Sequence, residues 1–159
     1  MPVIRTASSV ETEAAGICLG KLLGKGDIIC LNGDLGAGKT CFARGVARGL
    51  DIDEHITSPT FTLINEYQGL VPFYHFDVYR LAGPEDMEDL GFEEYFYGSG
   101  VTLIEWAALV EEVLPSERLD IWLSVDEEQV ECREIQLVSK GDRYRCLTEE
   151  MLKSVGFGN

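Results

Sequence analysis

The sequence lacks any apolar run close to the ~20 residues that a membrane-spanning helix needs. Residues 1–9 also lack the long apolar core of a secretory signal peptide. From these two absences we expect a protein without membrane contact, located in the cytoplasm.

Paired or clustered cysteines are missing too. The five cysteines are scattered, with no CxxC pair among them: Cys18, Cys30, Cys41, Cys132 and Cys146. This spacing indicates neither a disulfide framework nor a zinc site. We therefore expect reduced thiols that fill the core.

Basic residues are scarce. Thirteen Lys and Arg residues stand against 28 Asp and Glu residues, which gives a net charge of −15. This charge repels nucleic acid unless the positive side chains gather on one face, so we do not expect the chain alone to bind RNA or DNA tightly. It suits either solubility or docking onto a basic protein partner, and composition does not distinguish these two.

The length and hydrophobic composition of the chain are sufficient for one hydrophobic core. With 159 residues and 45% hydrophobic content, the chain can bury one substantial core and has no room for a second full domain. Internal repeats, low-complexity tracts and linkers are absent. We predict a single domain over residues 1–159.

The first third of the chain predicts a helix, a buried strand and a second helix. Residues 9–24 show helical spacing of apolar positions, with Ser8 and Glu11 spaced as a capping box. Residues 27–32 form a short apolar run that leads into a glycine-rich turn, and residues 39–50 again show a helical pattern.

The remaining sequence predicts further strands and two short helices. Alternation and turn residues favour strands at 61–67, 72–78, 101–104, 119–125 and 132–138, with the first two forming a hairpin and the last two a second hairpin or sheet edge. Helices are expected after Pro84 and over 106–113, and residues 140–142 read as a turn.

The glycine-rich turn matches the pattern GxxxxGK[ST] of a phosphate-binding P-loop (Walker A). Its residues are Gly33, Asp34, Leu35, Gly36, Ala37, Gly38, Lys39 and Thr40. The glycines let backbone N–H groups turn toward phosphate oxygens, and the helix that follows directs its positive end to the same anion. Lys39 is placed for the β and γ phosphates and Thr40 for Mg²⁺. We therefore predict a bound nucleoside triphosphate with Mg²⁺.

Two acidic residues are candidates for holding the metal or positioning water. Glu105 closes the predicted strand 101–104, and Asp77 lies at the end of another predicted strand. Carboxyl ends of parallel strands meet at the edge where a P-loop lies, so both carboxylates would reach the phosphates. The alternative for each is a solvated carboxylate at a strand end.

Other polar and aromatic residues near these positions have two interpretations. Residues 57–61, with Ser58 and Thr60, form either a switch-like loop or a plain capped turn. His75 is interpreted as a packed or hydrogen-bonded histidine rather than a base. Trp106 is either a helix anchor or a contact for nucleotide or partner.

Four motifs, GDLGAGKT (33–40), TSPTF (57–61), HFDVYR (75–80) and IEW (104–106), together resemble those of the bacterial TsaE family, formerly YjeE. The resemblance implies a small P-loop ATPase that assists threonylcarbamoyladenosine synthesis in tRNA, beside the anticodon, through the TsaD and TsaB proteins. The implied fold is α/β, a P-loop NTPase-type domain with a mixed, partly parallel central sheet flanked by helices.

The resemblance also implies roles for single residues. Lys39 and Thr40 would serve ATP and Mg²⁺, Asp77 and Glu105 would serve metal binding or hydrolysis, and Thr60 would lie on the switch-like loop. Further contacts to nucleotide or partner would come from Trp106, Ser9, Thr12 and Arg133.

Three rival functions remain open. A small-molecule kinase shares the P-loop, but only eight arginines are present and no arginine-rich lid segment is seen. A GTPase is suggested by residues 139–142 (SKGD), although 143–148 do not read as the helix that should follow, and Val78 stands where glycine is wanted. A regulator that binds ATP and hydrolyses little would have the same motifs.

Overall fold

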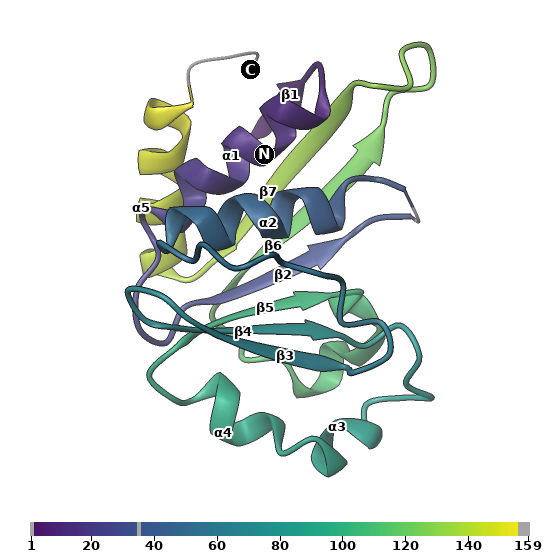
Figure 1. Ribbon diagram of the computed structural model, residues 1–159, viewed down its shortest axis with the longest axis vertical. Coiled ribbons are helices and arrows are strands. Elements are labelled where there is room, and N and C mark those ends of the chain that lie inside the picture. Colours follow the sequence, from purple (N-terminus) through teal and green to yellow (C-terminus); the bar gives the residue numbers. More distant parts are fainter. Residues whose placement is uncertain (1, 35, 156–159) are drawn as a thin grey trace.

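The computed structural model describes residues 2–34 and 36–155. Its strands form one mixed sheet in the order β1-β7-β6-β2-β5-β4-β3 (Figure 1). The strands are β1 (Val3–Thr6), β2 (Ile28–Asn32), β3 (Ile64–Gln68), β4 (Pro72–Asp77), β5 (Val101–Glu105), β6 (Arg118–Val125) and β7 (Arg133–Lys140). The helices are α1 (Ser9–Gly20), α2 (Lys39–Gly49), α3 (Asp86–Asp89), α4 (Phe92–Phe96), α5 (Asp142–Ser154) and the 3₁₀ helix η1 (Ala107–Val113). Within the described ranges, no helix is long and apolar enough to cross a membrane.

Four adjacent strands of the sheet are parallel. β2 pairs with β5 and β6, and β4 pairs with β5, in each case parallel. The antiparallel strands β3, β7 and β1 extend the sheet at its two sides. All residues of β2 and β5 are buried, as strands covered on both faces require.

Two hydrophobic clusters lie on the two faces of the sheet. α1, α2 and α5 pack on one face, around residues such as Leu19, Phe42 and Leu147. α3, α4 and η1 cover the other face at β2, β5 and β4, around Met87, Phe96 and Val110. Figure 1 shows these two groups of helices on opposite sides of the strands.

The helices α1 and α2 approach each other through glycines. A Cβ atom added at Gly45 would lie 2.1 Å from the carbonyl oxygen of Glu13, and one at Gly16 would lie 2.3 Å from that of Phe42. Real Cβ atoms do not come so close to a backbone oxygen. The absence of side chains at these positions therefore allows the two backbones to touch and fixes α1 beside the P-loop helix.

The predicted α/β fold with a mixed, partly parallel sheet is confirmed, and so are both hairpins. The first helix ends at Gly20, earlier than predicted. β3 begins at Ile64 rather than at residue 61, because the N–H of Leu63 donates to the carbonyl of Pro59 and closes a turn there.

Three elements, β1, α4 and α5, were not predicted. β1 is a four-residue edge strand, too short for alternation to identify. The reading of residues 143–148 as non-helical was wrong, because they lie within α5, where Tyr144, Leu147, Thr148 and Met151 form a buried stripe.

The presence of this helix does not support the GTPase hypothesis. β7 runs antiparallel to β6, and β6 runs parallel to β2, so residues 139–142 lie at the edge of the sheet opposite to the P-loop. The hydroxyl of Ser139 is also engaged within the protein, because it donates a hydrogen bond to the carbonyl of Tyr144. The segment is therefore not placed to read a base bound beside the P-loop.

Candidate functional site

The P-loop leaves β2 at its carboxyl end and leads directly into α2. Gly33 has φ +148°, and a Cβ there would lie 2.4 Å from the carbonyl oxygen of Leu123 on β6. Gly38 has φ +101° and is the N-cap of α2, without any side-chain hydrogen bond to cap the helix. The first N–H groups of α2 are thus available to an anion. Leu35 lies outside the described residues.

Lys39 is buried at the centre of this loop. Its ammonium group donates to the carbonyl oxygens of Gly33 at 2.6 Å and Asp34 at 2.9 Å. It also lies 4.0 Å from the centroid of the Trp106 ring, a cation–π distance. Burial lowers the pKa of Lys39, and the nearby carboxylates of Glu105 and Asp77 oppose this shift.

The two predicted acids lie side by side at the same edge of the sheet. Asp77 on β4 is opposite Glu105 on β5 in the parallel ladder, and both side chains are almost fully buried. The hydroxyl of Thr40, in the first turn of α2, donates to Glu105 Oε1 at 3.5 Å. The spacing of the strands therefore brings three oxygen-bearing side chains next to Lys39.

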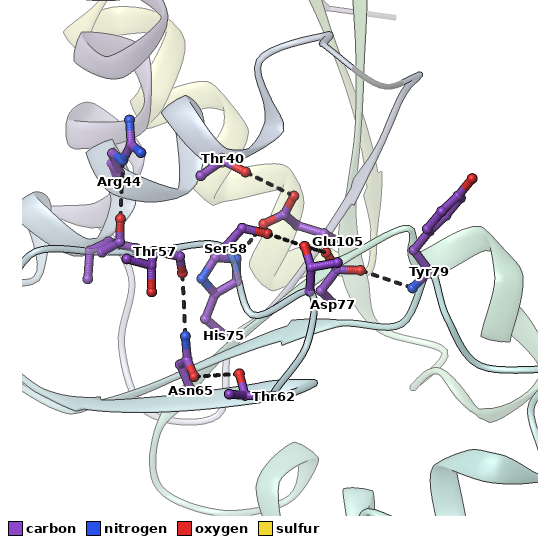
Figure 2. A network of polar contacts seen from close by, with 12 residues as sticks. Thr40, Arg44, Thr57, Ser58, Thr62, Asn65, His75, Asp77, Tyr79 and Glu105 are labelled. Carbon is purple, nitrogen blue, oxygen red and sulfur yellow. Dashed lines mark hydrogen bonds and ion pairs between the residues drawn. The ribbon is translucent and has the colours of Figure 1, made fainter.

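Each carboxylate is held by contacts on both oxygens (Figure 2). Asp77 accepts from the hydroxyl of Thr60 at 3.3 Å and from the backbone N–H of Tyr79 at 3.0 Å. Glu105 accepts from Thr40 through Oε1, and its Oε2 lies 2.6 Å from His75 Nε2. Buried carboxylates need such partners, because an unpaired buried charge is costly.

The segment that precedes β3 is tied to the site by side-chain hydrogen bonds (Figure 2). Ser58 and Thr60 share a hydroxyl contact of 2.8 Å, and Thr60 reaches Asp77 as described. Asn65 on β3 donates to the carbonyl of Thr57 at 3.4 Å, and Arg44 on α2 donates to that of Ile56 at 3.2 Å. This loop therefore touches both the P-loop helix and the acidic pair.

Most predicted site residues line one hollow of about 370 Å³. It is lined by Gly36, Gly38, Lys39, Thr40, Cys41, Ser58, Thr60, Asp77, Tyr79, Glu105 and Trp106. Ser9, Thr12 and Arg133 instead line a second hollow of about 370 Å³. Gly38 and Cys41 line both, so the two hollows adjoin at the start of α2.

Three residues of the second hollow have defined places. Thr12 is buried with its hydroxyl 2.7 Å from that of Thr6, and Ser9 opens α1 directly after the capping residue Ser8. Arg133, at the start of β7, donates to the carbonyl of Ala37 at 3.1 Å and that of Gly36 at 3.2 Å. Arg133 thus holds the P-loop itself. Gly33, Asp34 and Ala37 also line a third hollow, on the β6 side of the loop.

The arrangement fits a nucleotide with a divalent cation. Glycines with positive φ and an uncapped helix start form a cradle for phosphate, and Lys39 supplies the only charge of its sign among the residues that line the first hollow. Hydroxyl and carboxylate oxygens are ligands suited to Mg²⁺. In the described part of the chain, no cluster of three or more His, Cys, Asp or Glu residues could hold a metal alone.

Two residues of the site were not identified as functional from the sequence. Tyr79 lines the first hollow, and its ring lies 4.5 Å from that of Trp106. His75 was interpreted as packed or hydrogen-bonded, which agrees with its position, but not as a partner of Glu105. The sequence did contain a signal for this contact, because His75 precedes Asp77 by two residues and therefore lies on the same face of β4.

Comparison with known families identifies the family of this chain. The model of the family described as "Threonylcarbamoyl adenosine biosynthesis protein TsaE" matches residues 6–135. The chain belongs to the TsaE family. The resemblance inferred from the four motifs is confirmed, and with it a place in the biosynthesis of threonylcarbamoyladenosine in tRNA.

Curated members of the TsaE family are similar over most of their length. The protein of Bacillus subtilis (strain 168) is 46% identical over 158 residues, 98% of this chain and 96% of that protein. The protein of Treponema pallidum (strain Nichols) is 49% identical over 118 residues, 74% of this chain and 87% of that protein. Both are named tRNA threonylcarbamoyladenosine biosynthesis protein TsaE.

A solved structure has the same fold. The crystal structure of YdiB from Bacillus subtilis superposes with a TM-score of 0.82 at 42% identity, and the match covers 96% of this chain and 95% of that chain.

Proposed function

We propose that this TsaE-family protein binds and hydrolyses ATP with Mg²⁺, and that this activity supports threonylcarbamoyladenosine modification of tRNA beside the anticodon. It would act in the cytoplasm through a complex of TsaD and TsaB. The observation that carries the proposal is the convergence of Lys39, Thr40, Asp77 and Glu105 in one hollow at the start of α2.

The P-loop residues would bind the triphosphate. In the structure, Lys39 donates to the carbonyl groups of its own loop, and on nucleotide binding it would exchange these for β- and γ-phosphate oxygens. The N–H groups that open α2 would bind the phosphates as well. The adenosine would occupy the adjoining hollow, near Ser9, Thr12 and Arg133.

The two buried acids and Thr40 would serve the chemical step. Thr40, Asp77 and Glu105 are the residues that would hold Mg²⁺, which when bound neutralises charge that develops on the phosphate oxygens. A carboxylate oxygen at this edge can also accept a hydrogen bond from the attacking water and so orient it. Electrostatic positioning of this kind supplies most of the catalysis in phosphoryl transfer.

The loop that carries Ser58 and Thr60 would report the state of the nucleotide. Thr60 contacts Asp77, and Arg44 connects the same loop to α2. A change at the γ-phosphate would therefore shift the loop by differential contacts in the two nucleotide states. TsaD and TsaB would sense that shift. With a net charge of −15, this chain would contact tRNA only indirectly.

ATP hydrolysis by the purified chain, alone and with TsaD and TsaB, tests the proposal. We expect turnover that rises with the partners and is lost in Lys39→Ala and Glu105→Ala. Matched controls are Lys25→Ala and Glu112→Ala, which change exposed residues of the same types.

Two results would point elsewhere. Turnover that TsaD and TsaB do not stimulate would favour the small-molecule kinase, which a screen for phosphorylated metabolites would then identify. Modification activity that survives Lys39→Ala would refute a role for ATP in the function.

A further inference from the structure

His75 is a fully buried polar residue directly behind the acidic pair. Its side chain is 0% exposed, and its Nε2 lies 2.6 Å from Glu105 Oε2. Its Nδ1 has no hydrogen-bond partner among the residues that the structure describes. Among the described residues, the polar group that holds this ring is therefore a single carboxylate, that of Glu105 in the candidate site.

The ladder between β4 and β5 produces this contact. His75 is opposite Leu103, and Asp77 is opposite Glu105. Because alternate residues of a strand share a face, all four side chains point to the same side of the sheet. Asp77 and Glu105 line the hollow, whereas His75 is enclosed one step back along β4 (Figure 2).

The contact divides the two oxygens of Glu105 between two partners. Oε1 faces the hydroxyl of Thr40 at 3.5 Å, on the phosphate side, while Oε2 is held by His75 at 2.6 Å. Because an ionised carboxylate can only accept hydrogen bonds, the ring nitrogen that faces it is the donor, and Nε2–H donates to Oε2 in a charge-assisted hydrogen bond.

We propose that His75 is a positioning residue that anchors Glu105 through Oε2 and so keeps Oε1 turned toward Thr40 and the phosphates. This inference rests on the function proposed above for the same site. Removing a residue that hydrogen-bonds to a metal ligand commonly lowers metal affinity or activity about 10–100-fold.

A role in packing alone makes a different prediction. His75 stacks on Phe73 with ring centroids 6.0 Å apart, so it also fills space in the core. Any side chain of similar size would serve packing, and an apolar one would do so without burying an unpaired nitrogen. Only the positioning role requires an N–H donor at the place of Nε2.

The test compares His75→Met with His75→Gln. Both side chains have similar length, but only glutamine can donate an amide N–H to Glu105. Three quantities are measured: kcat and KM for ATP with TsaD and TsaB present, the Mn²⁺ concentration for half occupancy by electron paramagnetic resonance with a non-hydrolysable ATP analogue, and the thermal midpoint. The control is His55→Met, a change at the exposed histidine.

For His75→Met we expect kcat to fall and half-saturating Mn²⁺ to rise, each by at least about 10-fold, while KM changes by less than about threefold. His75→Gln should recover most of both losses. The inference would be overturned if His75→Met kept the wild-type kcat and Mn²⁺ affinity. It would also be overturned if both variants lost kcat and Mn²⁺ affinity equally and both had a lowered thermal midpoint.

The Mn²⁺ measurement separates the two proposals. If the wild-type protein binds Mn²⁺ with the analogue but does not hydrolyse ATP, the proposed ATPase function fails while the contrast between methionine and glutamine still decides the role of His75. If the wild-type protein binds neither, both proposals are refuted.

Discussion

Substituting alanine for Gly45 tests the close contact between α1 and α2. The added Cβ would lie 2.1 Å from the carbonyl oxygen of Glu13, whereas ordinary contact begins at 3.4 Å. The two helices would have to separate locally by about 1.3 Å, because a backbone carbonyl cannot rotate away as a flexible side chain can. Such overpacking in a core costs about 1–3 kcal/mol, and a backbone clash belongs at the upper end.

Helix propensity acts in the opposite direction. Replacing an interior helical glycine by alanine stabilises a helix by about 1 kcal/mol, so we expect a net loss of about 2 kcal/mol in the free energy of unfolding. For a protein of this size the thermal midpoint should fall by about 4–8 °C.

Thermal and urea unfolding without nucleotide, followed by circular dichroism, measure the effect. Gly24→Ala is the control, because nothing lies within 4 Å of a Cβ at that position, and it should change stability by less than about 0.5 kcal/mol. A Gly45→Ala protein as stable as the wild type, or more stable, would show that propensity dominates and that the helices do not touch as described.

Three further predictions concern contacts of single side chains. Arg133→Ala removes the donor that holds the carbonyls of Gly36 and Ala37, so ADP should bind about 10-fold more weakly in isothermal titration; unchanged affinity would contradict a role in shaping the P-loop. Thr60→Val removes the hydrogen bond to Asp77 and should lower partner-stimulated ATP turnover about 10-fold while ADP affinity stays the same. The backbone N–H of Ile28, which is buried, donates to the Tyr144 hydroxyl at 2.9 Å. Tyr144→Phe leaves this N–H unpaired and should lower the free energy of unfolding in urea by about 1–3 kcal/mol. Burial raises the pKa of Tyr144 from 10.0 to about 12, so its contribution to stability is complete below pH 10 and is lost as pH rises toward 12, a slope that the phenylalanine variant should lack.

The parts of the site that depend on local sequence were predictable. The P-loop is a contiguous motif, and Asp77 and Glu105 each close a strand, so parallel strands bring them to one edge without knowledge of the register. Thr40 follows from the motif itself. These positions needed only the rule that the carboxyl ends of parallel strands meet.

Contacts that depend on register or on weak patterns were not predictable. The partner of His75 is set by the pairing of Asp77 with Glu105, which no single segment of the sequence specifies. The hold of Arg133 on the P-loop joins residues 96 and 97 positions apart. α5 was missed although its buried residues, Tyr144, Leu147, Thr148 and Met151, recur at the helical period, because only two of them are strongly apolar and its tyrosine and threonine have low helix propensity.

The position of Trp106 gives the protein an optical reporter of its own. The indole ring lies 4.0 Å from the ammonium group of Lys39, so any ligand that draws Lys39 away changes the electrostatic surroundings of the chromophore. The chain contains two tryptophans, and the other, Trp122, lies 44% exposed on β6. In a Trp122→Phe variant, tryptophan emission would therefore come from the candidate site alone, and occupancy of the P-loop could be followed in real time without a label.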